Sequence, residues 1–272
     1  MAELNKGMGW VPDLPDGRDL LYAAPLKPLA KLPDKVDLRK QCPKEVYNQG
    51  DLGSCTANAI AGALEFDQKK QKLKGVFTPS RLFIYYNERA MEGTIESDSG
   101  AMIRDGIKSV AKRGACKESS WPYKIERFRE KPGRACYAEA KEHQAIQYMR
   151  VNQSLSQLKG CLAEGFPFVF GFAVYESFLG AKVARTGKVE MPRANEAWEG
   201  GHAVLAVGYD EGEQRFIVRN SWGSGWGIDG YFTMPYPYLL QGTLSRDFWT
   251  IRQVEGTQGK SRRAGGKRKK RS

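Results

Sequence analysis

Apolar residues are spaced differently in the two halves of the chain. Through most of the first half, and once more after residue 150, they recur with the three-to-four-residue spacing of helices. The predicted helices begin at Ser54 with Cys55 in the first turn, begin at Thr78-Pro79 with Thr78 as cap, run from about Ala101 to Arg113, and run from a capping box at Ser154–Gln157 to about Gly165.

The second half is built from short apolar or alternating runs that are separated by glycines and acidic turns. This pattern predicts strands at Phe168–Val174, His202–Tyr209, Arg215–Arg219 and Gly230–Met234. We therefore expect an α+β protein in which a helical lobe and a strand-rich lobe meet at a cleft.

The two ends of the chain lack this patterning. Prolines at positions 12, 15, 25 and 28 predict an irregular arm over residues 1–32. Its segment Gly9–Asp16 could lie along the cleft with Trp10 and Leu14 as anchors, or could pack on the surface as a tether. Residues 256–272 hold eight Lys and Arg and no acid, so we expect a disordered basic tail. Without these eight residues the net charge of +12 falls to +4, so the body over residues 33–255 is not a basic nucleic-acid surface.

The composition also suggests where the protein works. We find no apolar run of membrane-spanning length and no apolar core of a signal peptide, so we expect an intracellular protein that does not contact a membrane. We also expect a monomer. The tail over 256–272 would suit contact with nucleic acid or with a nuclear import receptor, and the protein would then be nuclear or nucleic-acid-associated. The alternative is a solubilising tail without a specific partner.

Three short motifs carry candidate chemistry. Cys55 follows Gln49 by six residues, His202 stands in Gly201-His202-Ala203-Val204, and Asn220 opens Asn220-Ser221-Trp222-Gly223. A helix N-terminus and a neighbouring imidazolium both lower a thiol pKa, so Cys55 is a candidate nucleophile and His202 its general acid and base. Asn220 could orient the imidazole, and Gln49 could donate to an oxyanion. The second histidine, His143, lies in a polar setting typical of a solvated surface.

Together these motifs resemble the papain-like cysteine peptidases. The shared features are the order Cys, His, Asn, the Gln-to-Cys spacing and the extended run from Arg219 to Gly227, and the resemblance covers roughly residues 33 to 250. It implies a two-lobe fold, with a helical lobe mainly over 50–140 and an antiparallel β-barrel-like lobe mainly over 141–250. It also implies a cysteine endopeptidase that cleaves polypeptides through a thiolate and an acyl-enzyme, without a metal or other cofactor.

The resemblance extends to supporting residues. It implies that Trp222 shields the bond between His202 and Asn220, and that Gly100 and Ala101 align an extended substrate. Three small residues, Gly171, Gly201 and Ala203, would line a roomy pocket for the second residue before the scissile bond, which favours a bulky aliphatic or aromatic side chain there.

The chain also departs from the family. The usual disulfide beside the nucleophile is missing at both ends, where Leu52 and Asp98 stand, and Thr56 replaces the usual aromatic residue after the thiol. The other four cysteines, Cys42, Cys116, Cys136 and Cys161, could be paired or free. Two further hypotheses fit the motifs: a papain-shaped acyl transferase or amidase, and an inactive peptide-binding protein whose tail contacts nucleic acid.

Overall fold

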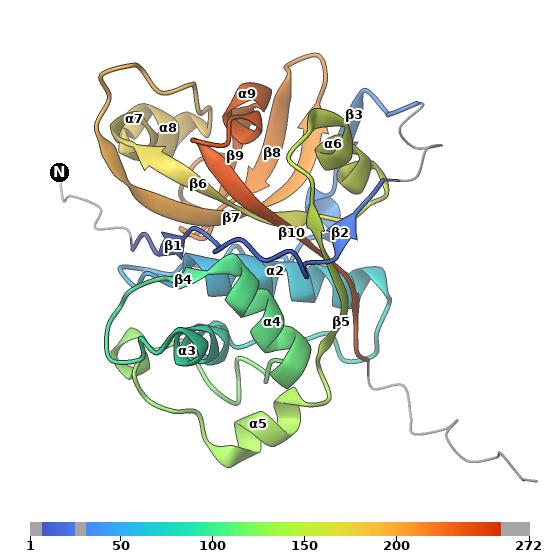
Figure 1. Cartoon of the computed structure of the whole chain (residues 1–272), viewed down its shortest axis with the longest axis vertical. Helices are drawn as coiled ribbons and strands as arrows, with labels where there is room; N and C mark the ends of the chain where they lie inside the picture. The colour runs from blue at the N-terminus through green and yellow to red at the C-terminus, as the bar shows by residue number, and fades with distance from the viewer. Residues whose placement is uncertain (1–6, 25–30, 257–272) are drawn as a thin grey trace, which may run out of the picture.

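The computed structural model describes residues 7–24 and 31–256, and it divides into a helical lobe and a sheet lobe (Figure 1). The helical lobe contains α2 (Cys55–Lys70), α3 (Arg81–Glu92), α4 (Ile103–Arg113) and α5 (Arg134–Ala140), with short 3-10 turns at Arg39–Gln41 and Ile125–Arg127. In Figure 1 these four helices lie in the lower half, and α2 lies next to the sheet. The α+β class predicted from the spacing of apolar residues is confirmed.

The main sheet has eight strands in the order β2-β5-β10-β6-β7-β8-β9, with β3 paired to β7. Its strands are β2 (Leu21–Tyr22), β3 (Lys35–Asp37), β5 (Ala145–Val151), β6 (Phe168–Tyr175), β7 (Trp198–Asp210), β8 (Arg215–Arg219), β9 (Tyr231–Pro235) and β10 (Ser245–Val254). All neighbours are antiparallel except β2 and β5. Within the described residues the ends of this series do not pair with each other, so the expected barrel is an open sheet. Short helices flank it: α6 (Leu155–Ala163), α7 (Glu176–Leu179), α8 (Ala181–Thr186) and α9 (Tyr236–Leu240).

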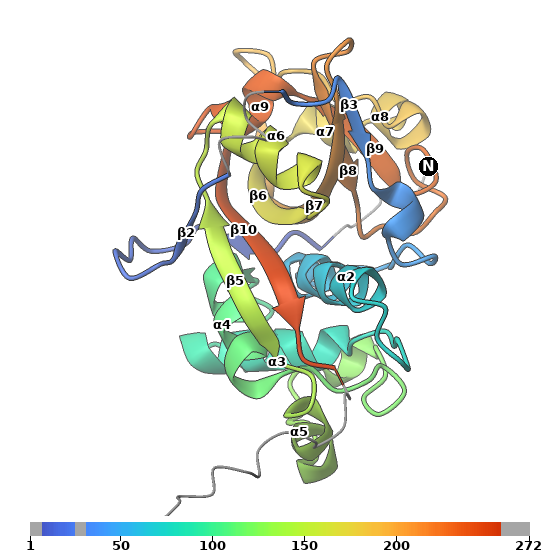
Figure 2. The same ribbon diagram turned by 90° about the vertical axis from the view of Figure 1, so that its right-hand side faces the viewer.

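Helix α2 is the element that joins the two lobes. Every residue from Cys55 to Gln68 is buried, because the helix packs against β7 and β10 on the sheet side and against α3 and α4 on the helical side. Figure 2 shows the long strands β5 and β10 running from the sheet lobe down beside the helical lobe. Burial on all sides fixes the position of the first turn of α2, which carries Cys55.

Two predicted helix starts are wrong, and a third lacks its expected cap. Helix α3 begins after Ser80, whose Oγ accepts a hydrogen bond from the Phe83 N–H at 3.1 Å, while Pro79 forms a β-bridge with Lys117 and so keeps Thr78 out of the cap. Helix α4 begins at Ile103 rather than Ala101, because residues 101–102 form the short strand β4 (Ala101–Met102). At α6, Ser154 is the N-cap residue but its side chain makes no capping hydrogen bond.

The N-terminal arm is more regular than its prolines suggest. Strand β1 (Trp10–Val11) pairs in parallel with β4 on the helical lobe, and β2 pairs in parallel with β5 of the main sheet. Residues 1–6 and 25–30 of the arm, and residues 257–272 of the basic tail, lie outside the described residues. Among the residues that are described, we find no helix with the length and apolar character needed to cross a membrane.

Candidate active site

Cys55 is the first residue of α2 and is completely buried. The backbone N–H groups of Ala203 on β7 and Gly9 in the arm lie near enough to its thiol to lower the thiol pKa. The residue that follows His202 is therefore close to the sulfur. The sheet lobe supplies one wall around Cys55, and the arm covers it from another side.

The loop before Cys55 is held by a carboxylate instead of a disulfide. Both Asp98 oxygens accept the Gly53 N–H, at 2.9 and 3.1 Å, and Asp98 also accepts the Tyr85 hydroxyl. All five cysteines are free thiols. The usual disulfide of the family that this chain resembles would join positions 52 and 98. Here the hydrogen bond from Gly53 to Asp98 holds the same loop.

His202 is held by an amide and a stacked indole. Its Nε2 lies 2.8 Å from Asn220 Oδ1, and its ring stacks on Trp222 with a centroid distance of 4.9 Å and an interplanar angle of 28°. Asn220 Oδ1 also accepts the Ser221 N–H at 2.8 Å, which orients the amide oxygen toward the ring. All three side chains are buried, so water has little access to the histidine–asparagine bond.

The Gln49 side chain points its amide nitrogen toward the arm. Ser221 Oγ donates to Gln49 Oε1 at 2.6 Å, and this contact assigns the other end of the amide as the donor. Gln49 Nε2 then donates to the Gly7 carbonyl oxygen at 2.8 Å and to the Leu52 carbonyl oxygen at 2.9 Å. The donor predicted to face an oxyanion is occupied by a carbonyl group of the arm.

The arm also lies against Gly100, Ala101, Gly171 and Gly201, four of the five residues predicted to contact substrate. The Ala101 N–H donates to the Gly9 carbonyl oxygen at 2.7 Å, and a Cβ added to Gly100 would lie 2.0 Å from that same oxygen. Added Cβ atoms on Gly171 and Gly201 would collide with the Trp10 indole at 2.0 and 2.9 Å. Ala203 pairs with Gly171 across β6 and β7. By contrast Leu14, the second expected anchor, is 67% exposed.

Burial under the arm affects the ionisation of the thiol. Loss of water around Cys55 raises the pKa of its thiol to about 12, although backbone N–H groups from Ala203 and Gly9 act in the opposite direction. The sequence alone predicted a thiolate near neutral pH. Burial thus acts against the thiolate form of Cys55, because a charged sulfur would lie in a site with little water.

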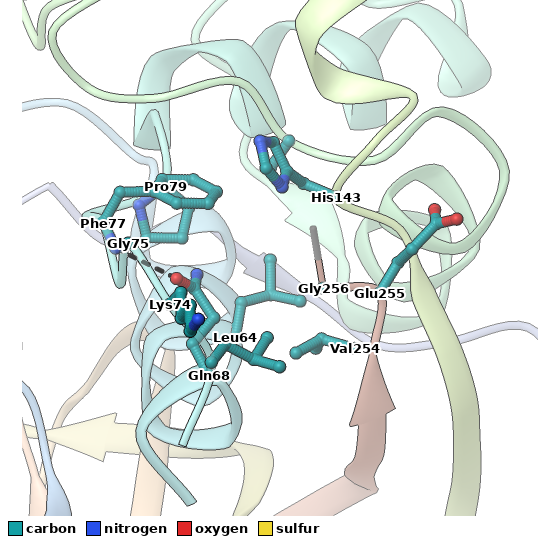
Figure 3. A pocket seen from close by; sticks show the side chains of 12 residues that line it. Leu64, Gln68, Lys74, Gly75, Phe77, Pro79, His143, Val254, Glu255 and Gly256 are labelled. Atoms are coloured by element: carbon teal, nitrogen blue, oxygen red, sulfur yellow. Dashed lines mark hydrogen bonds between the residues drawn. The ribbon is translucent and has the colours of Figure 1, made fainter. Parts of the chain in front are cut away.

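His143 is not the solvated surface residue that its neighbours suggested. It is half-buried, its ring packs on Phe77 with a centroid distance of 4.4 Å, and burial lowers its pKa. Figure 3 shows it among the side chains that line a pocket, together with Leu64 and Val254. The volume of this pocket is about 20 Å³. This space holds about one water molecule, and its lining does not include Cys55, so His143 belongs to a packing region.

Two contributors to the site were missed by the sequence analysis. Ser221 fixes the Gln49 amide, and its position directly after Asn220 could have indicated that it belongs to the site. Asp247 on β10 accepts the Trp10 Nε1–H at 3.2 Å. No motif marks Asp247, because only the pairing of β10 with β6 brings it to this place.

Known proteins are similar to this chain in sequence and in fold. Residues 32–238 match the model of the papain family cysteine proteases. The chain is 44% identical to a peptidase C1-like protein of Acanthamoeba polyphaga mimivirus, covering 93% of this chain and 89% of that protein. It is 32% identical to cathepsin S of Bos taurus over 76% of this chain and 61% of that protein.

Solved structures agree with the sequence comparisons. Xylellain, a cysteine protease from Xylella fastidiosa, matches with a TM-score of 0.87 and 46% identity, covering 93% of this chain and 98% of that one. Procathepsin L 3 of Tenebrio molitor, at 21% identity and a TM-score of 0.67, shares the fold over 90% of this chain and 77% of its own.

Proposed function

The chain belongs to the papain family of cysteine proteases, and from this premise we propose how its residues divide the hydrolysis of a peptide bond. Cys55 is the nucleophile, because it stands at the N-terminus of α2, where the helix dipole favours an anion. When a substrate replaces the arm, the thiol passes its proton to His202, and the sulfur attacks the scissile carbonyl carbon.

His202 then returns the proton. The carbonyl π electrons move to oxygen in the attack, and the collapse of this tetrahedral adduct breaks the C–N bond while His202 protonates the leaving amine. The same ring next removes a proton from water, which attacks the thioester and releases the acid and the thiol. The bond from Nε2 to Asn220 Oδ1 supports this role, because an imidazole donating through Nε2 uses its other ring nitrogen for proton exchange.

Gln49 stabilises the oxyanion together with the Cys55 backbone N–H. The donor bond from Gln49 Nε2 to the Gly7 carbonyl supports this assignment, because a carbonyl oxygen already occupies the place where the negative charge would develop. One such donor contributes about 3–4 kcal/mol to transition-state stabilisation. Gly100 and Ala101 hold the substrate backbone, while Gly171, Gly201 and Ala203 line the pocket for the second residue before the scissile bond.

The described part of the arm, through Gly7, Gly9 and Trp10, keeps the enzyme inactive in this form. Its Gly7 carbonyl occupies the Gln49 donor, its Gly9 lies on the Cys55 thiol, and its Trp10 fills the pocket. Burial of the site also raises the pKa of the Cys55 thiol. Full activity therefore requires the arm to leave the cleft, by release or by cleavage.

The observation that carries the proposal is the fixed group of His202, Asn220 and Trp222 on the wall next to Cys55. The proposal can be tested with the full-length chain carrying Gly9→Val. An added Cβ at Gly9 would lie 1.7 Å from the Gly53 carbonyl oxygen, so this substitution prevents docking of the arm. This variant should hydrolyse unfolded casein. Adding Cys55→Ala should abolish hydrolysis, whereas adding the control Cys161→Ala should not. Hydrolysis that survives Cys55→Ala would refute the assignment.

The basic tail gives the protein a second, separate contact. We propose that residues 256–272 of a monomer inside the cell bind nucleic acid or an import receptor; the eight basic residues and the five free thiols, which suit a reducing compartment, support this. Replacing the five residues from Lys267 to Arg271 with Gln in the full chain should remove salt-sensitive DNA binding and nuclear accumulation. If both persist, the tail is only a solubilising segment.

A further inference from the structure

Thr56, the residue that follows the nucleophile, is tied to helix α3. Its side chain is completely buried, and its Oγ1 donates a hydrogen bond to Glu88 Oε1 at 2.6 Å. Glu88 is a residue of α3 and is also completely buried. The first turn of α2 therefore has a polar anchor inside the helical lobe, on the side of α2 that packs against α3.

The carboxyl group of Glu88 is enclosed by three helices. Figure 1 shows α3 and α4 below α2. The Oε1 atom meets Thr56 of α2, and a Cβ added to Gly106 of α4 would lie 2.5 Å from Oε2 and 2.4 Å from Ile60 Cδ1. A side chain at position 106 would thus displace the carboxyl group. Glu88 has one confined position where α2, α3 and α4 meet.

The surroundings of Glu88 favour its uncharged form. Among the described residues its Oε2 has no hydrogen-bond partner. The guanidinium of Arg89, the next residue along α3, donates to backbone carbonyl oxygens. Burial and the nearby acids Glu92 on α3 and Asp105 on α4 raise the pKa of Glu88 well above its ordinary value, while Thr56 and Arg89 act in the opposite direction. Burial without a paired cation thus acts against the carboxylate.

A charge on Glu88 would also work against the chemistry of Cys55. Burial is the largest cause of the raised pKa of the Cys55 thiol, and a negative charge on Glu88 acts in the same direction. An uncharged carboxyl group avoids this effect and still offers Oε1 as an acceptor. Glu88 can therefore anchor the first turn of α2 without opposing formation of the thiolate.

We propose that Glu88 is a positioning residue, which in its uncharged form holds Thr56 and so fixes the first turn of α2. That turn carries the Cys55 sulfur and the backbone N–H proposed to stabilise the oxyanion. Glu88 acts through Thr56 and is not itself a catalytic residue. The proposal rests on the assignment of Cys55 as nucleophile. Its physical basis is the sensitivity of catalysis to position, since a displacement of about 1 Å can slow a reaction about a hundredfold.

The kinetic test measures peptide hydrolysis by the full-length Gly9→Val protein. Thr56→Val keeps the shape of the side chain but removes the donor, and it should lower kcat about tenfold with little change in KM. Thr56→Ser keeps the hydroxyl and should restore kcat. Glu88→Gln keeps an uncharged acceptor and should stay close to the parent protein. An unchanged kcat in Thr56→Val would overturn the proposal.

The matched control is the same substitution at another buried threonine. Thr250 is completely buried in the sheet lobe, and its Oγ1 donates to the Pro167 carbonyl oxygen at 2.9 Å. Thr250→Val should therefore lose a comparable hydrogen bond, and it should leave kcat unchanged. An equal loss of kcat in Thr250→Val and Thr56→Val would show a general effect of lost stability and would overturn the role of Glu88.

Two further measurements test the partnership and the charge. Glu88→Leu should lower kcat as much as Thr56→Val does, and the double variant should be no slower than either, because all three lack the same hydrogen bond. Losses that add in the double variant would overturn the link between the two residues. The pH dependence of Cys55 alkylation reports the charge: Glu88→Gln should leave the thiol pKa unchanged, and a lower pKa in that variant would overturn the uncharged form.

These measurements separate this proposal from the protease assignment. If the Gly9→Val parent cleaves peptides and Thr56→Val is equally fast, only the role of Glu88 fails. If the parent cleaves no peptide, the protease assignment fails, and alkylation of Cys55 by iodoacetamide tests Glu88 by itself. Thr56→Val should then slow alkylation at pH 7 about fivefold, because the sulfur no longer has its fixed place at the helix start. Rates equal to those of the parent would overturn the inference.

Discussion

Ser221 Oγ donates a hydrogen bond to Gln49 Oε1 over 2.6 Å, and this contact decides which end of the Gln49 amide faces the cleft. An amide can turn over and present either its oxygen or its nitrogen. Only the nitrogen can stabilise a developing oxyanion, because the oxygen would repel it. A serine that touches no reacting atom thus controls a group proposed to act in catalysis.

We expect Ser221→Ala to lower kcat by about tenfold with little change in KM, because the freed amide then spends part of its time turned the wrong way. The measurement is peptide hydrolysis in the Gly9→Val background. Ser224→Ala, at an exposed position three residues further on, is the matched control and should be neutral. An unchanged kcat in Ser221→Ala would mean that other contacts suffice to orient Gln49.

Opening the arm should expose the nucleophile. In the full-length chain, Gly9→Val should raise the rate of Cys55 alkylation by iodoacetamide by at least about tenfold, because the thiol regains water and its pKa falls toward the ordinary range. Mass spectrometry of the Cys55 peptide gives the rate. Gly17→Val is the control, because an added Cβ there has no atom within 4 Å. Equal rates in the two variants would show that the arm does not limit access.

The carboxylate that holds the loop before Cys55 should contribute to stability. Asp98→Ala removes the acceptor for the buried Gly53 N–H and for the Tyr85 hydroxyl, so we expect a loss of about 1 kcal/mol, since Asp98 itself is exposed. Thermal unfolding followed by circular dichroism measures this loss. Asp98→Asn keeps an acceptor and should lose less, and Asp51→Ala at a nearby exposed acid should lose nothing.

Docking of the arm should strengthen in acid. Burial and the neighbouring charge of Asp247 raise the pKa of Asp13 from 3.8 to about 6. The docked form thus binds a proton more tightly than the released form. Stabilisation from this proton is fully present below about pH 4 and is lost as the pH rises through about 6, an effect of about a hundredfold in the docking equilibrium.

A fluorophore on Leu14→Cys, an exposed position of the arm, can follow this equilibrium in a Cys55→Ser background that removes thiol chemistry. Its anisotropy should be higher at pH 5 than at pH 7.5. In Asp13→Asn the difference should disappear, because the amide keeps its size but does not titrate. Looser docking at pH 5 than at pH 7.5 would contradict the assignment of Asp13.

The sequence predicted the elements whose side chains are buried with a regular period. Helix α2 and strands β6, β7, β8 and β9 were found because apolar spacing reports the face that meets the core. The start of α3 was misplaced because Thr78-Pro79 satisfies the local rule for a helix start, while a bridge from Pro79 to Lys117 engages that segment elsewhere. A rule based on neighbouring residues could not predict this bridge, because Lys117 lies 38 residues after Pro79 in the chain.

The same limit applies around the cleft. The spacing of the motifs identified Gln49, Cys55, His202 and Asn220 as candidate site residues. In the structure His202 Nε2 lies 2.8 Å from Asn220 Oδ1. Asp247 could not be predicted, because its position depends on a register shift between β10 and β6. Strand β1 was missed for a related reason: two residues carry no period, and their extended shape comes from the edge of β4 that they join.

The arm and the cleft belong to one chain, and β2 fastens the arm to the main sheet beyond the cleft-binding segment. A covalently attached occupant competes with substrate at a fixed effective concentration, whatever the protein concentration in solution. Diluting the protein therefore cannot switch it on, as it would for an enzyme held by a separate inhibitor. Activation requires either a chemical change within the molecule or a substrate concentration high enough to displace the attached arm from the cleft.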